Sequence, residues 1–211
     1  MFETTVETGG SIRTAGDAAK IFVPLSRNVH YDQYASHTLT RGSSMQLDLT
    51  VNGEPKAIEA APDDDLASVL RREGYTGVKC GCDGGVCGAS KVLLDGDAVM
   101  ACGETARDAD GATIETVEGL GTQDDLHPIQ QAFVDTFAVQ CGFCIPGMII
   151  QAKELLDETP NPSEAEVREA IDDNLCRCTG YQKPVEAILD AADRLNGDGA
   201  VATDGGDRPQ Q

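Results

Sequence analysis

The stretch Gln140-Cys141-Gly142-Phe143-Cys144-Ile145-Pro146-Gly147 decides how the C-terminal half of this chain is organised. It carries two thiols in a C-x2-C spacing, and a C-x-C pair, Cys176 and Cys178, follows about one helical hairpin later. A C-x2-C pair suits a helix start, where free backbone N–H groups and the positive end of the helix dipole favour thiolate over thiol. Pro146 suits the same place because its fixed φ and missing N–H cost least in a first helical turn.

Four thiolates that converge can hold either an iron–sulfur cluster or a structural zinc ion. Zinc sites usually combine two C-x2-4-C or His-containing knuckles, so a C-x-C half is uncommon among them. The spacing therefore favours iron–sulfur over zinc. Four buried cysteines without a metal are a third interpretation, and the clustering of the thiols speaks against it.

The motifs QCGFCIPGMIIQAKELL, from Gln140, and NPSEAEVREAIDDNLCRCTGYQKPVEAI, from Asn161, resemble the helical 2Fe-2S domain of the small subunit of molybdenum hydroxylases. That family includes xanthine dehydrogenases, aldehyde oxidoreductases and aerobic carbon monoxide dehydrogenases, and the resemblance runs from about Met45 to Leu195. It implies that the cluster closest to the molybdopterin is bound by Cys141, Cys144, Cys176 and Cys178. It also implies that Gln140 and Cys178 lie against the pterin.

The composition limits the classes of partner and compartment. A net charge of −20 excludes a nucleic-acid partner that needs its phosphates neutralised. So many carboxylates give an acidic surface, such as a salt-loving host would also produce. The chain opens without a basic, apolar leader and contains no run of eighteen apolar residues, so we expect neither export nor a membrane span. Clustered cysteines in a reducing cytoplasm are metal ligands more often than disulfides.

The pattern predicts an α+β protein with two metal-binding domains, because the eight cysteines fall into two groups of four. We expect a β-grasp, plant-type ferredoxin domain followed by an all-α four-helix domain, flanked by a disordered extension and a disordered tail. The expected boundaries are 1–44, 45–120, 121–196 and 197–211. In the extension, His30 and His37 are read as surface residues.

Period-two alternation from Gln46 and the turn Asn52-Gly53 predict a β-hairpin. A helix capped by the acidic run 63–65 should follow and end at Gly74. Further strands are expected at 91–94, 98–101 and 113–117, a glycine-punctuated linker at 118–121, and helices at 128–138, 146–157, 164–173 and 184–195. Ser163 with Glu166 reads as a capping box. The apolar residues assigned to the helical core include Phe137, Leu175 and Leu195.

The loop 79–90 is the second metal-binding candidate. Plant-type ferredoxins bind 2Fe-2S through C-x4-C-x2-C and a distant fourth cysteine. Here Cys82 and Cys87 give the x4 spacing and Cys102 is the distant ligand, but Ser90 stands where the third thiol belongs. Cys80 could replace it, Ser90 could bind as an alkoxide, or the cluster could be lost. We favour Cys80 because eight thiols then fill eight places.

No nucleophile, acid–base set, Walker loop or dinucleotide fingerprint is found, and His127 beside Pro128 reads as structural. One-electron transfer is the chemistry that remains. The resemblance implies a relay from a molybdopterin cofactor on a large subunit, through two 2Fe-2S clusters, to FAD on a medium subunit. A free-standing two-cluster ferredoxin and a zinc-stabilised interaction module are the alternatives. The substrate, whether carbon monoxide, an aldehyde, a purine or an N-heterocycle, is selected by the large subunit and leaves no trace in this sequence.

Overall fold

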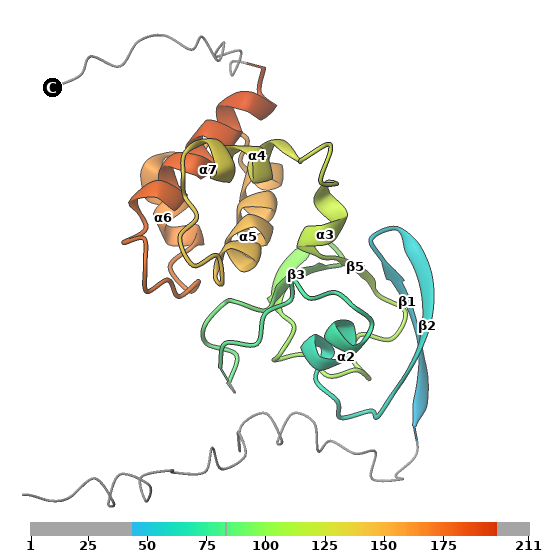
Figure 1. Cartoon of the computed structure of the whole chain (residues 1–211). Coiled ribbons are helices and arrows are strands. Elements are labelled where there is room, and N and C mark those ends of the chain that lie inside the picture. Colours follow the sequence, from blue (N-terminus) through green and yellow to red (C-terminus); the bar gives the residue numbers. More distant parts are fainter. Residues whose placement is uncertain (1–43, 83, 198–211) are drawn as a thin grey trace, which may run out of the picture. The chain divides into compact units, whose positions relative to one another are not determined.

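The computed structural model describes residues 44–82 and 84–197, drawn in colour in Figure 1. The expectations for the N-terminal extension, with His30 and His37, and for the C-terminal tail lie outside these residues. The first half of the described part contains the strands with one short helix among them, and the second half contains only helices, so the protein is α+β. No helix there is long and apolar enough to cross a membrane.

A β-hairpin opens the described chain, as predicted. β1 (Met45–Val51) pairs antiparallel with β2 (Glu54–Ala60). Asn52 and Gly53 at the turn both have positive φ, 52° and 80°, which is the backbone of the tight turn that matches strand twist. Every second residue of β1 is buried, so one face of the hairpin points into the core.

The hairpin is one edge of a five-stranded mixed sheet with the order β2-β1-β5-β3-β4. β5 (Thr113–Glu115) runs parallel to β1 and antiparallel to β3 (Lys91–Leu94), and β4 (Asp97–Met100) forms the other edge. The helix α2 (Leu66–Arg72) begins at Asp65, whose carboxylate accepts a hydrogen bond from Ser68 N at 2.8 Å. Its buried face joins the inward residues of the sheet in one apolar core.

The predicted linker after β5 is wrong in one respect, because it contains the short helix α3 (Val117–Leu120). Gly119 allows this helix to approach the hairpin turn, since a Cβ there would lie 2.3 Å from Asn52 Oδ1. That same oxygen accepts a hydrogen bond from Thr116 N at 2.8 Å. The segment is therefore packed against the hairpin turn and is not a free linker.

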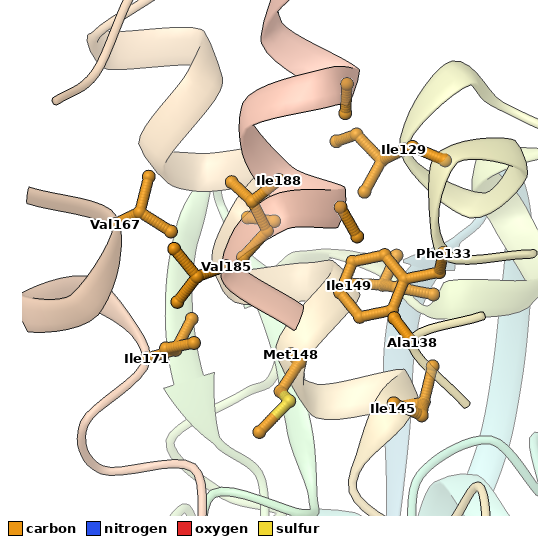
Figure 2. Close-up of a cluster of buried hydrophobic side chains, with 14 of the residues drawn as sticks. Ile129, Phe133, Ala138, Ile145, Met148, Ile149, Val167, Ile171, Val185 and Ile188 are labelled. Carbon is orange, nitrogen blue, oxygen red and sulfur yellow. The ribbon is translucent and has the colours of Figure 1, made fainter. Parts of the chain in front are cut away.

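The C-terminal half consists of α4 (Pro128–Asp135), α5 (Ile145–Glu158), α6 (Glu164–Ala170) and α7 (Gln182–Leu195). Their apolar faces meet in a second core, in which Phe133, Met148 and Ile188 are central (Figure 2). The predicted capping box of α6 is present, with Ser163 and Glu166 bonded in both directions. α5 also packs against β3 and β4, so helices and sheet share an interface.

Three residues assigned to the helical core are on the surface. Phe137 is 79% exposed, Leu175 is 66% exposed and Leu195 is 45% exposed. The first two lie beyond the ends of α4 and α6, which stop earlier than predicted, so the helical period no longer applies to them. Leu195 is the last residue of α7, and this end of the apolar face of the helix is exposed to solvent.

His127 gives α4 a pH-dependent cap. Its Nδ1 accepts a hydrogen bond from Ile129 N at 3.3 Å, and burial is the main reason why the pKa of His127 is lowered. The unfolded chain takes up the proton at a higher pH than the folded chain does. The stabilisation of the folded state by the neutral His127 side chain is therefore complete above about pH 6.5 and is lost as the pH falls through the folded pKa.

We expect His127→Asn, which caps without titrating, to lose less stability than the unmodified protein between pH 7.5 and 5.5, by about 0.5–2 kcal/mol. Urea unfolding of both proteins at the two pH values measures the difference. Equal losses in both proteins would show that this cap does not titrate.

Candidate metal centres

The C-x2-C pair lies at the start of α5, where the sequence places it. Cys144 is the N-cap of the helix and is buried, whereas Cys141 is exposed on the preceding turn. That turn is closed by Gly142, with φ 80° and a hydrogen bond from Ile145 N to its carbonyl at 3.3 Å. Gln140, expected to touch the pterin, is exposed next to Cys141.

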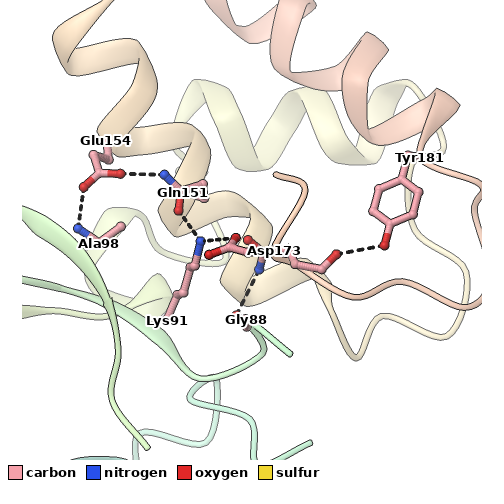
Figure 3. Close-up of polar contacts among 8 residues, drawn as sticks. Gly88, Lys91, Ala98, Gln151, Glu154, Asp173 and Tyr181 are labelled. Atoms are coloured by element: carbon pink, nitrogen blue, oxygen red, sulfur yellow. Dashed lines mark hydrogen bonds and ion pairs between the residues drawn. The ribbon is translucent and has the colours of Figure 1, made fainter. Parts of the chain in front are cut away.

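The C-x-C pair lies on a turn that Tyr181 holds in shape. The Tyr181 hydroxyl donates a hydrogen bond to Asn174 O at 3.1 Å (Figure 3). It also accepts a hydrogen bond from Cys176 N at 2.8 Å. Thr179 approaches the Cys176 sulfur twice, through Oγ1 at 3.0 Å and through its backbone N at 3.4 Å. Both thiols of a C-x-C pair can reach one metal centre only if the backbone between them curves. Here side chains of the same turn hold the backbone in that shape.

The pKa values show which thiols are neighbours. Burial, with the adjacent Cys176 thiol, raises the pKa of Cys144 to about 12. For Cys178, the hydrogen bond with the Cys141 thiol is the main reason why the pKa is raised. Burial opposes ionisation of Cys176, but the hydrogen bonds from Thr179 outweigh it and lower its pKa. The four cysteines thus stand as two pairs, Cys141 with Cys178 and Cys144 with Cys176.

Thr179 should tune the potential of any cluster bound here, because donors to ligand sulfur favour the reduced, more negative state. We expect Thr179→Val, which keeps the shape and removes the hydroxyl, to lower that potential by roughly 20–65 mV, the equivalent of one hydrogen bond. Redox titration followed by EPR measures it. Thr136→Val is the control, because that hydroxyl bonds only Ala132 O, at 2.8 Å, within α4. An unchanged potential in the Thr179 variant would remove this tuning role.

The loop between α2 and β3 holds a second pair. Hydrogen bonds from the backbone of Gly84 and Val86 lower the pKa of Cys82 to about 7. Burial, together with the Cys82 thiol, raises the pKa of Cys87. Backbone N–H groups that point at sulfur are what a loop around a cluster must supply.

Cys80, Ser90 and Cys102 come together on three adjacent segments. Lys79 N bonds Ala89 O at 3.2 Å, and Ala101 N bonds Ser90 O at 3.2 Å. Burial raises the pKa of Cys80, and Cys102 and Cys87 are close enough to add to the shift. Ser90 is 2% exposed, and its Oγ accepts a hydrogen bond from Cys102 N at 3.3 Å. Both candidates for the missing ligand therefore flank Cys102.

The donor set fits two 2Fe-2S clusters. Each iron of such a cluster takes two protein ligands, so a site of four thiols divided into pairs matches the need. The helical site shows two thiol pairs, and the loop site shows the pair Cys82–Cys87 with Cys80 beside Cys102. Within 44–82 and 84–197 no three Cys, His, Asp or Glu side chains are arranged around a single metal ion.

Sequence reasoning missed the residues that join the two sites. Lys91 is buried, and its Nζ contacts Asp173 Oδ1 at 2.6 Å and also Gln151 Oε1 (Figure 3). Asn174 is fully buried. Asn174 directly precedes Leu175 and the C-x-C motif, which is a positional hint. Nothing in the sequence marks Lys91, because a lysine in a strand is usually exposed.

Comparison with known proteins yields two family models. A 2Fe-2S iron–sulfur cluster binding domain matches residues 49–118, and a [2Fe-2S] binding domain matches residues 116–189. The two matches together cover all eight cysteines.

Known proteins are similar to this chain over most of its length. The nicotine 6-hydroxylase small subunit of Paenarthrobacter nicotinovorans is 45% identical over 152 residues, which are 72% of this chain and 92% of the relative. The nicotinate dehydrogenase small FeS subunit of Eubacterium barkeri is 43% identical over 153 residues, 72% of this chain and 98% of the relative. The crystal structure of quinoline 2-oxidoreductase from Pseudomonas putida 86 superposes with a TM-score of 0.71 at 42% identity, covering 76% of this chain and 100% of that one.

Proposed function

This chain belongs to the small iron–sulfur subunits of the molybdenum hydroxylases and serves as the electron-transfer subunit of an oxidoreductase, and we propose that it relays electrons from a large molybdopterin-binding subunit to FAD on a medium subunit. The main support for this proposal is that the eight thiols form two groups of four, one in the loop before β3 and at Cys102, the other among the helices. Two 2Fe-2S clusters bound there would supply one-electron carriers in series. Relatives named as subunits of larger enzymes favour this relay over a free-standing ferredoxin.

Each half of the chain takes one cluster in this proposal. We assign 45–120 to a β-grasp, plant-type ferredoxin domain and 121–196 to a four-helix 2Fe-2S domain. The sheet order, with β5 central and parallel to β1, and the apolar core that α2 shares with the sheet support the first assignment. The four helices around one apolar core support the second.

The proposed ligands follow the pairs. The helical-domain cluster is held by Cys141, Cys144, Cys176 and Cys178. The β-grasp cluster is held by Cys80, Cys82, Cys87 and Cys102, with Ser90 as the alternative to Cys80. Cys80 is the better donor for iron, because a thiolate is softer than an alkoxide and a serine hydroxyl is harder to deprotonate. The hydroxyl of Ser90 is also already engaged by Cys102 N.

The large subunit would dock over the helical-domain cluster, at the end occupied by Gln140 and Cys178, which the pterin would touch. Exposed apolar side chains surround this end: Phe137 is 79% exposed, Phe143 is 46% exposed and Val139 is 44% exposed. Phe137 is held outward on a backbone with φ 56°, which is uncommon for a bulky residue. An aromatic side chain presented in this way suits the buried centre of a subunit interface.

We expect Phe137→Glu to release the large subunit, because the carboxylate would be desolvated in an apolar contact. The chain is purified from its host with its partners, and the share that co-elutes with a molybdenum-containing large subunit is measured. Ala57→Glu is the control, since Ala57 is exposed on the edge strand β2, remote from both pairs of helical-domain thiols. Unmodified chain that elutes alone, with both clusters bound, would contradict the relay and support a free-standing ferredoxin.

We also place the chain in the cytoplasm, because its eight free thiols must remain reduced until iron binds. Its substrate is chosen on the large subunit. The relatives named for nicotine, nicotinate and quinoline make N-heterocycles the first class to assay with the purified complex.

A further inference from the structure

The two candidate cluster sites touch through their backbones. Leu175 N donates a hydrogen bond to Cys87 O at 2.9 Å. Cys87 is a proposed ligand of one cluster, and Leu175 is bonded directly to Cys176, a proposed ligand of the other. A single hydrogen bond and a short run of covalent bonds therefore separate the sulfurs of Cys87 and Cys176.

A second hydrogen bond holds the same segments together. Asn174 Nδ2 donates to Gly88 O at 2.9 Å, within a fully buried contact (Figure 3). The other amide atom, Asn174 Oδ1, is buried and has no partner among the described residues. A buried, unpaired acceptor costs free energy. Asn174 therefore makes this contact at a cost in free energy.

The contact has no room for further side chains. A Cβ on Gly147 would lie 2.2 Å from Gly88 O and 2.8 Å from Asn174 Nδ2. A Cβ on Gly88, whose φ is 67°, would lie 2.7 Å from Asp173 O. Two glycines on different elements therefore let three backbone segments meet directly.

Two neighbouring contacts hold the arrangement in place. Lys91 Nζ bonds Asp173 Oδ1 at 2.6 Å from the sheet side, next to Asn174. From the helix side, the Tyr181 hydroxyl bonds both Asn174 O and Cys176 N. The segment 173–176 is thus fixed at both ends against β3 and α7.

We propose that this contact is the route by which electrons pass between the two clusters, and that Asn174 is the positioning residue that keeps its segments at hydrogen-bond distance. The inference rests on the proposed function. With both clusters bound, one electron would pass from the helical-domain cluster, which would be oxidised, to the β-grasp cluster, which would be reduced, without transfer of a proton. The large subunit's substrate would be the ultimate reductant, and the flavin of the medium subunit would be the acceptor.

The test uses the full chain with both clusters bound. A photoreduced deazaflavin delivers about one electron per molecule, and rapid-freeze EPR follows its exchange between the clusters, whose reduced signals differ. We expect Asn174→Ala and Gly147→Ala to lose the fast phase of exchange while both midpoint potentials stay unchanged. Gly147→Ala is informative because alanine suits the helix α5 better than glycine and acts only through the contact.

Leu175→Ala is the matched control, because it removes an exposed side chain and keeps the N–H that bonds Cys87 O. Its exchange should equal that of the unmodified protein. Unaltered exchange in both Asn174→Ala and Gly147→Ala would overturn the inference. So would the absence of spin–spin splitting when both clusters of the unmodified protein are reduced, a measurement that needs no variant. If the unmodified protein lacks one of the two signals, the proposed function fails as well.

Discussion

Cys178→Ser removes the EPR signal of the helical-domain cluster and leaves that of the β-grasp cluster. Cys178 is exposed and interacts with the Cys141 thiol, so in the proposed ligand set its loss would take one of the two thiols from one iron. A serine hydroxyl is a harder donor and must be deprotonated before it binds iron, so it is a poor substitute. Iron content should fall from about four to about two per chain.

Cys82→Ser is the reciprocal control, because it should remove the β-grasp signal and leave the helical-domain signal. If the spectrum of the Cys178 variant matches that of the unmodified protein, the proposed ligand set is wrong. Cys80→Ala and Ser90→Ala then decide the irregular ligand. We expect the β-grasp cluster to disappear in the first and to persist in the second, and the opposite result would assign the position to Ser90.

Asp173→Ala destabilises the protein by about 3 kcal/mol, because it leaves the Lys91 ammonium buried without its anionic partner. The Lys91 side chain is 2% exposed and that of Asp173 is 45% exposed. This partial exposure places the expected loss at the lower end of the range for broken buried pairs. Urea unfolding of the chain with its clusters bound measures the loss.

Lys91→Met is the matched control for this ion pair. Methionine fills the volume of the lysine stem, and the half-exposed Asp173 carboxylate left behind is hydrated. Its cost should therefore be clearly smaller than that of Asp173→Ala. Equal losses in the two variants would mean that the loss of the ion pair itself sets the cost, and not the burial of an ammonium without its partner.

The sequence predicts the regular elements well where a local signal is strong. The Asn52-Gly53 turn, the Asp65 cap and the Ser163–Glu166 capping box are all present as expected. The signal fails at helix ends, because a helical period cannot show where a helix stops. Phe137 and Leu175 continue the apolar stripes of α4 and α6 in sequence but lie past the last helical turn.

The candidate sites are predicted only in part. Cysteine spacing predicts both groups of candidate ligands, since metal binding demands a fixed set of donors close together. No local sequence pattern predicts the contact between the two groups of cysteines. Lys91 and Asp173 are 82 positions apart, and Asn174 and Gly88 are 86 apart, so only the folded chain brings them together. Gly147, in the first turn of α5, likewise reads as a weak helix residue until its distance to Gly88 O is known.

The identity of the bound metal is the most direct test of the central claim. Iron, acid-labile sulfide and zinc should be measured on the protein isolated from its host, with EPR of the dithionite-reduced sample. We predict about four irons and about four sulfides per chain, with two distinct 2Fe-2S signals. Zinc in place of iron, or no metal at these cysteines, would contradict the account.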